Sequence, residues 1–155
     1  MFYIKNGYLT LNGILLNNGT QNIIIIGPSG NGKSTYVKEE LSDNSIRILD
    51  DDIVVFDPKN LIALHGNQKI SVNKIIFYYN SIKDDIDLNF SNKDIFSISL
   101  AVPILGNELS RNIIAVEKLQ EKIDVLYQEF LKLKIIYFNI INYNYEEISR
   151  NIGLE

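Results

Sequence analysis

A run of four isoleucines, Ile23–Ile26, leads directly into the segment Gly27-Pro28-Ser29-Gly30-Asn31-Gly32-Lys33-Ser34. A short run of β-branched apolar residues is typical of a central strand that is buried on both faces. The segment after it matches the spacing G-x-x-x-x-G-K-[ST] of a phosphate-binding loop in full. Such a loop needs a strand before it and a helix after it, and we predict a helix over Ser34–Leu41. This strand–loop–helix unit indicates an α/β fold.

The residue types in the loop suit the binding of a triphosphate. Glycines let the backbone curl so that successive N–H groups face phosphate oxygens, and the helix adds its positive N-terminal end. Lys33 supplies a flexible positive charge for the β- and γ-phosphates, and the Ser34 hydroxyl is a hard oxygen ligand for magnesium. We therefore expect ATP, or another nucleoside triphosphate, with Mg²⁺. The predicted nucleotide-binding residues are Gly27, Pro28, Ser29, Gly30, Asn31, Gly32, Lys33, Ser34 and, as a weaker substitute for Ser34, Thr35.

Three consecutive carboxylates, Asp50-Asp51-Asp52, follow a second predicted strand, Ile46–Leu49. An apolar strand that ends in Asp is the pattern that holds magnesium beside a phosphate-binding loop. Another Asp is of the type needed to accept a proton from an attacking hydroxyl. Adjacent carboxylates repel one another, and a bound Mg²⁺ would offset that repulsion. The alternative interpretation is a solvated acidic turn at the end of a strand.

The rest of the chain predicts a single domain over residues 1–155, in which a mixed β-sheet carries the phosphate-binding loop and is flanked by helices. Asn6-Gly7 and Asn12-Gly13 predict tight turns, because both residue types tolerate positive φ. Asp57-Pro58 predicts a hairpin turn. A three- and four-residue apolar repeat predicts an amphipathic helix over Glu108–Leu133. The predicted strands are Phe2–Ile4, Tyr8–Leu11, Ile14–Leu16, Ile53–Phe56, Leu61–Leu64, Ile75–Tyr79, Phe96–Leu100 and Ile135–Ile141, and a last short helix begins at Asn144.

Three segments resemble the catalytic domain of the HPr kinase/phosphorylase family, which is similar to phosphoenolpyruvate carboxykinase. The first runs from Asn12-Gly13 through the isoleucine strand into the loop and Thr35. The second, Arg47–Val54, is similar to the family's stretch that ends in two aspartates. The third contains Val102-Pro103, Gly106 and Arg111-Asn112, and looks like a stretched form of the family's P-V-x-P-G-R-N segment.

The resemblance implies specific roles for three residues. Asp51 would be a magnesium ligand, Asp52 would be the general base, and Arg111 would approach the transferring phosphate. These residues would act with Lys33 and the magnesium ligand Ser34 of the loop motif. Two departures are visible. Asn12 stands where family members often carry His, and the glycine-rich signature linked to phosphorylase activity has no clear counterpart. The N-terminal domain of the full enzymes also has no counterpart in this sequence, so the chain looks like a minimal, free-standing kinase of this kind.

Composition excludes some classes of protein. The net charge of −4 argues against a general nucleic-acid binder, which usually carries a basic face. No apolar run approaches the roughly 20 residues that span a bilayer, so we expect no membrane partner. The absence of cysteine fits the cytoplasm, where we expect the protein to act. Because the family's enzymes assemble into oligomers, we keep a homo-oligomer as an alternative to a monomer, with the Glu108–Leu133 helix as a candidate contact.

The sequence favours a kinase that moves the γ-phosphate to a hydroxyl, with Ser or Thr of a peptide or protein as the acceptor. A small-molecule or nucleotide kinase is a second interpretation. Those enzymes usually begin near the loop strand and carry an arginine-rich lid, whereas this chain has several strands before the loop and three arginines: Arg47, Arg111 and Arg150. A nucleotide-binding regulatory module without turnover is a third. The one histidine, His65, is interpreted as a solvated turn residue.

Overall fold

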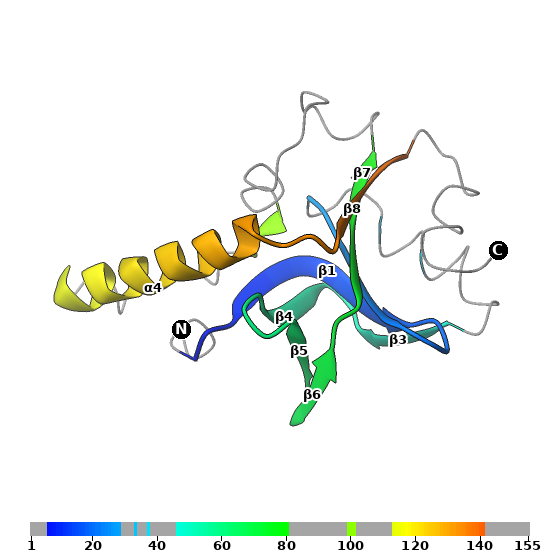
Figure 1. Ribbon diagram of the computed structural model, residues 1–155, viewed down its shortest axis with the longest axis horizontal. Coiled ribbons are helices and arrows are strands. Elements are labelled where there is room, and N and C mark those ends of the chain that lie inside the picture. The colour runs from blue at the N-terminus through cyan, green and yellow to red at the C-terminus, as the bar shows by residue number, and fades with distance from the viewer. Residues whose placement is uncertain are drawn as a thin grey trace.

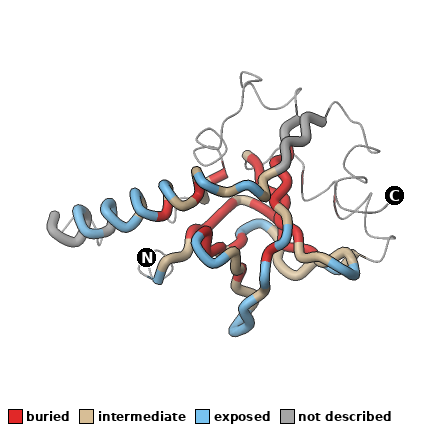
Figure 2. Tube along the Cα trace, in the orientation of Figure 1, coloured by how far each residue is buried: buried red, intermediate tan, exposed pale blue. Residues whose placement is uncertain are grey.

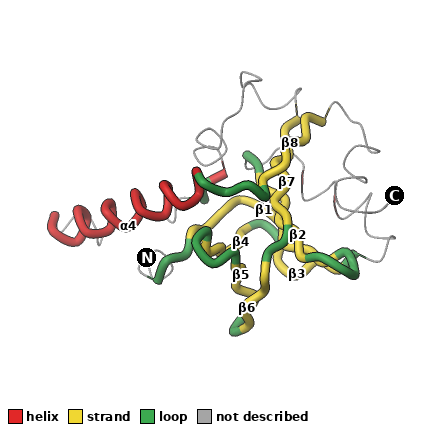
Figure 3. Tube along the Cα trace, viewed as in Figure 1, coloured by secondary structure: helices red, strands yellow, loops and turns green. Residues whose placement is uncertain are grey.

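The computed structural model describes residues 6–28, 33, 37, 46–80, 99–101 and 113–141. Within them the chain forms a mixed eight-stranded sheet and one helix whose course is described, α4 (Ile113–Leu131) (Figures 1 and 3). Seven strands follow one another in the order β6-β5-β4-β1-β2-β7-β8, and β3 pairs with β1 off this path. The strands are β1 (Leu9–Asn17), β2 (Asn22–Ile26), β3 (Arg47–Asp50), β4 (Ile53–Asp57), β5 (Ile62–His65), β6 (Gln68–Ser71), β7 (Lys74–Asn80) and β8 (Ile136–Ile141).

The predicted α/β fold, a sheet flanked by helices, is wrong for the described residues, which are mostly β. The reason lies in the connections. β1 is antiparallel to β2, β3 and β4, and β4, β5 and β6 follow one another as antiparallel neighbours. Antiparallel neighbours need only a short turn, whereas parallel neighbours need a crossover. The parallel pair β7–β8 has α4 in its crossover.

β1 is the strand that organises the sheet. One of its edges pairs with β2, and the other pairs first with β4 and then with β3. The sequence predicted two strands here with a turn at Asn12-Gly13, and that turn prediction is wrong. Gly13 serves a close approach instead, because a Cβ atom at this position would lie 2.5 Å from the Ile25 carbonyl oxygen.

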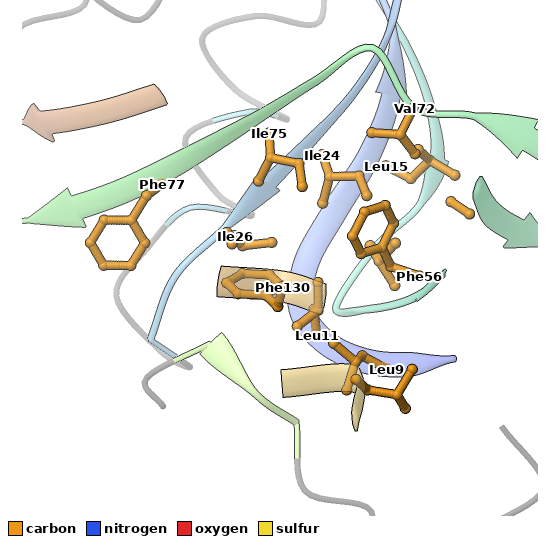
Figure 4. Packing of buried hydrophobic residues seen from close by; sticks show 13 residues of the cluster. Leu9, Leu11, Leu15, Ile24, Ile26, Phe56, Val72, Ile75, Phe77 and Phe130 are labelled. Carbon is orange, nitrogen blue, oxygen red and sulfur yellow. The ribbon is translucent and has the colours of Figure 1, made fainter. Parts of the chain in front are cut away.

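Both faces of the central strands are buried, as the isoleucine run predicted (Figure 2). One face forms a core in which Phe56 and Phe77 pack with Phe130 of α4 (Figure 4). The other face packs alternate residues of the same strands against Val37, which has helical backbone. Val37 lies within the predicted Ser34–Leu41 helix, whose other residues are outside the described part.

Most of the other predicted elements are confirmed with small shifts of their bounds. The Asp57-Pro58 hairpin joins β4 to β5, and the amphipathic repeat corresponds to α4. The predicted strand Phe96–Leu100 is wrong at Ser99, which is helical, while Leu100 forms an isolated bridge with Leu11. β6 was not predicted, because Gln68–Ser71 is largely polar. Phe2–Ile4 and the helix at Asn144 lie outside the described residues.

Candidate functional site

The phosphate-binding loop begins where β2 ends. Gly27 is buried, and its N–H donates to the Asn12 carbonyl of β1 over 3.2 Å, one position beyond the β1–β2 ladder. The backbone that enters the loop is therefore held by β1 as well as by β2. Gly27, Pro28 and Lys33 are the loop residues that the structure describes. Ser29, Gly30, Asn31, Gly32, Ser34 and Thr35 lie outside the described residues.

Lys33 is only 7% exposed and has helical backbone. Its ammonium group donates to the Pro28 carbonyl over 2.9 Å, so the side chain reaches back to the first residues of the loop. Val37 also has helical backbone and is fully buried against the sheet. The lysine charge lies beside the start of the loop. A buried cation suits a highly charged anion such as a triphosphate.

The acidic triplet lies at a break between two strands. β3 ends at Asp50 and β4 begins at Ile53, and both pair with the same edge of β1. The β1–β3 register shifts between Leu15 and Leu16. Asp52 has a φ of 83°, a conformation that few residues with a side chain adopt. The backbone therefore leaves regular β geometry at Asp51 and Asp52, between the end of β3 and the start of β4.

One peptide unit of β1 links the loop to the triplet. The Asn12 carbonyl accepts from Gly27 N–H, and the N–H of the next residue, Gly13, donates to the Asp52 carbonyl over 3.1 Å. These two groups belong to the same peptide bond and point to opposite sides of the strand. Gly27 and Asp52 therefore stand on opposite sides of β1, separated by two strand spacings, or roughly 10 Å of backbone.

The structure gives the positions of those predicted site residues that it describes. The loop start and Lys33 lie on one side of β1, and Asp51 and Asp52 on the other. Asp51 is partly exposed and Asp52 is exposed. The pairing of Asp51 with Ser34 and the position of Arg111 fall outside the described residues. The segment before Arg111 does reach β1, because Ala101 N–H donates to the Thr10 carbonyl over 2.9 Å.

His65 was interpreted as a solvated turn residue, but it ends β5 and lies against the triplet. Its Nδ1 atom is 3.3 Å from Asp50 Oδ1, with the two side chains 39% and 31% exposed. The predicted β4–β5 hairpin could have indicated this contact in advance, through its strand register. In the antiparallel β4–β5 register Val55 pairs with Leu64, so His65 returns to the start of β4, next to the triplet. The contact places the Asp50 carboxylate at the end of β5.

The donor chemistry of this junction fits magnesium with a triphosphate. No group of three or more acidic or histidine side chains that could hold a metal forms within the described part of the chain. Mg²⁺ in nucleotide sites usually keeps several waters and takes only one or two carboxylates besides the phosphates. Asp51 and Asp52 carry hard oxygen donors of that kind, and Lys33 carries a positive charge of the kind that suits phosphate.

A separate cavity of about 330 Å³ lies beside α4 and is lined by Gly7, Glu121, Lys122, Val125 and Leu126. It is wide open, and none of its described lining residues belongs to the loop or the triplet. We assign the candidate site to the loop and triplet, because a phosphate-binding backbone and paired carboxylates carry specific chemistry and the α4 cavity offers none.

No protein-family model matches the chain, and no curated protein matches it significantly. Among the described helices, none is long and apolar enough to cross a membrane.

Proposed function

We propose that this protein is a magnesium- and ATP-dependent phosphotransferase that moves the γ-phosphate to the hydroxyl of Ser or Thr in a peptide or protein. The observation that carries the proposal is the single Asn12–Gly13 peptide, which bonds the loop start on one side and the acidic triplet on the other. A phosphate-binding loop alone is compatible with simple nucleotide binding. A loop flanked by carboxylates within about two strand spacings has what transfer to a hydroxyl requires.

In this proposal, Lys33, Asp51 and Asp52 have different roles. Lys33 binds the phosphate end of the nucleotide, since its ammonium group lies beside the loop start and forms stronger hydrogen bonds with charged oxygens than with a carbonyl. Asp51 holds the hydrated magnesium ion, which supplies charge neutralisation at the phosphates. Asp52 accepts or orients the proton of the acceptor hydroxyl, and its exposed position is open to an incoming acceptor.

Phosphoryl transfer passes through a loose transition state, so positioning and charge stabilisation matter more than proton removal. The rigid part of the site suits that demand. Gly27 and Asp52 are each hydrogen-bonded to β1, and β1 is buried on both faces. The sheet therefore fixes the spacing between the backbone of Gly27 and the backbone of Asp52.

The test is an assay of the full chain with ATP labelled on its terminal phosphate, magnesium, and a peptide library that carries Ser or Thr at one position. We expect label on the hydroxyl residue, and loss of that label in Lys33→Ala. Label on small hydroxylated compounds alone would replace the peptide acceptor by a metabolite. Tight MgATP binding with no transfer to any acceptor and no hydrolysis would favour a binding module. Absence of MgATP binding would refute the nucleotide site itself.

A further inference from the structure

Ser99 carries a hydroxyl whose burial the fold does not explain. Its side chain is fully buried, and its Oγ atom has no hydrogen-bond partner in the part of the chain that the structure describes. It is the one buried side-chain polar atom among the described residues in this situation. A buried hydroxyl without a partner costs free energy, so such a group calls for a physical explanation.

The neighbourhood of Ser99 is the start of the phosphate-binding loop. On one edge of β1 the Thr10 carbonyl accepts from Ala101 N–H, and the Asn12 carbonyl accepts from Gly27 N–H. Carbonyls two residues apart on one strand are separated by roughly 7 Å. Two segments that are far apart in the sequence thus meet end to end along this edge.

The direction of the second segment brings Ser99 closer still. Ala101 lies at Thr10, and Leu100 bridges Leu11 in antiparallel sense. The preceding residue, Ser99, therefore continues toward Asn12, the residue to which Gly27 is bonded. Leu100 packs against the core on the α4 face and holds this segment in place.

The second hydroxyl of this neighbourhood provides a contrast. Thr10 is also buried, with 7% exposure, and its Oγ1 donates to the Ala101 carbonyl. Two buried hydroxyls thus lie within a few residues of each other along one edge of β1. One is satisfied in the unliganded protein and the other is not, which is the pattern expected if the second is reserved for a ligand.

We infer that Ser99 is a nucleotide-binding residue, whose hydroxyl donates a hydrogen bond to a phosphate oxygen when MgATP occupies the loop. The inference rests on the proposed nucleotide site and adds to it a donor from a segment that carries no phosphate-binding motif. A triphosphate is the ligand class that fits, because charged oxygens are what a loop start of this kind collects. Binding then gives the orphaned hydroxyl its partner.

The experiment measures two quantities for each full-length variant: the Kd of MgATP by calorimetric titration and the Tm of the unliganded protein. Ser99→Ala removes the hydroxyl and should raise the Kd about tenfold or more, the loss expected for one hydrogen bond to a charged group. Its unliganded Tm should stay equal to that of the wild type or rise, because a buried unpaired polar group has been removed. Ser99→Cys fills the same space with a weak donor and should show the same loss of affinity.

Thr10→Val is the matched control. It removes a hydroxyl that is already bonded, so its unliganded Tm should fall while its Kd for MgATP stays near that of the wild type.

Three outcomes are decisive against the inference. An unchanged Kd in both Ser99 variants would overturn it. A Ser99→Ala protein that is unfolded, or as destabilised as Thr10→Val, would also overturn it, because the hydroxyl would then have a structural partner. A wild type that does not bind MgATP would remove the proposed nucleotide site first, and that failure is visible before any variant is compared.

Discussion

Asp52 holds a backbone conformation that residues with a side chain usually avoid, at φ 83°, and it is the last residue of the acidic triplet. Strain of this kind costs about 1–3 kcal/mol and tends to occur where function needs a particular side-chain position. Asp and Asn are among the residues that tolerate positive φ best. Asn can therefore replace Asp52 without disturbing the backbone, which makes the charge separable from the shape.

The first prediction concerns the two carboxylates with proposed roles. Asp52→Asn should keep MgATP affinity and lower turnover by roughly 10²–10⁴-fold, the usual contribution of a positioned base. Asp51→Asn should weaken magnesium-dependent nucleotide binding as well. Asp50→Asn is the control, because the Asp50 carboxylate contacts His65 and has no assigned role in transfer. Steady-state kinetics with calorimetric Kd values distinguish the three, and an Asp52→Asn enzyme with normal turnover would refute the assigned base.

Gly13 supports a second prediction at this scale. Its φ is not among the positive values, so the glycine is required by space and not by backbone strain. A Cβ atom there would meet Ile25 O at 2.5 Å, and backbone cannot move aside as a flexible side chain can. Gly13→Ala should therefore cost about 1–3 kcal/mol of unfolding free energy, the range for overpacking. Because it pushes β2 away from β1, it should also weaken MgATP binding.

Gly19→Ala is the control for that substitution. Gly19 has φ +100° and nothing within 4 Å of an added Cβ, so its substitution strains a turn without moving β2. Urea denaturation should show a loss of about 1 kcal/mol with unchanged nucleotide affinity. A Gly13→Ala protein as stable as the wild type would mean that β1 and β2 are packed less closely than described.

Among the elements, α4 is attached to the sheet near its C-terminal end. Figures 1 and 2 show the helix extending away from the strands, with its buried positions close to the sheet. Leu126 and Phe130 are buried, at 6% and 0% exposure, whereas Val125 is 61% exposed. The last turns of the helix are therefore the part that stabilises the core.

The third prediction follows from that attachment. Phe130→Ala should lower the free energy of unfolding by about 3–5 kcal/mol, because it empties a fully buried site in the core. Val125→Ala, on the same helix but exposed, should change it by less than about 0.5 kcal/mol. Chemical denaturation of both variants tests the contrast. Equal effects would mean that the face of α4 that carries Val125 also packs against the core.

At the scale of the whole molecule, nucleotide binding and sheet stability are linked through β1. Gly27 and Asp52 are bonded to adjacent backbone groups of that strand, so a ligand that engages the loop and the triplet also bridges β1. A ligand that binds only the folded state raises the free energy of unfolding by about 2.7 kcal/mol at a hundred times its Kd.

The fourth prediction is that thermal denaturation of the full chain shifts upward with MgATP and that this shift needs both parts of the site. Lys33→Ala should abolish the shift, because it removes the positive charge that lies beside the start of the loop. Omitting magnesium should reduce the shift in the wild type. A shift that survives in Lys33→Ala would place the nucleotide elsewhere on the protein.

Local chemistry decided much of this protein before any tertiary contact was considered. The strand at Ile23–Ile26, the Asp57-Pro58 hairpin and the amphipathic helix follow from side-chain periodicity and turn preferences, which act over a few residues. The loop motif and the carboxylates after β3 are local features of the same kind. These signals say which residue types occur together along the chain, and they were sufficient to nominate Lys33, Asp51 and Asp52.

What only the tertiary structure decided is which segments share an edge of β1. Gly13 was predicted as a turn residue from its Asn-Gly pair, yet it lies within β1. Glycine is needed at this position because a Cβ atom would lie too close to the Ile25 carbonyl oxygen. The predicted helix-flanked fold failed for a similar reason, since antiparallel pairing replaced crossovers. The contact between His65 and Asp50 and the approach of Ser99 to Gly27 depend on strand register. Register is set by the combined packing of residues far apart in sequence, and no local pattern encodes it.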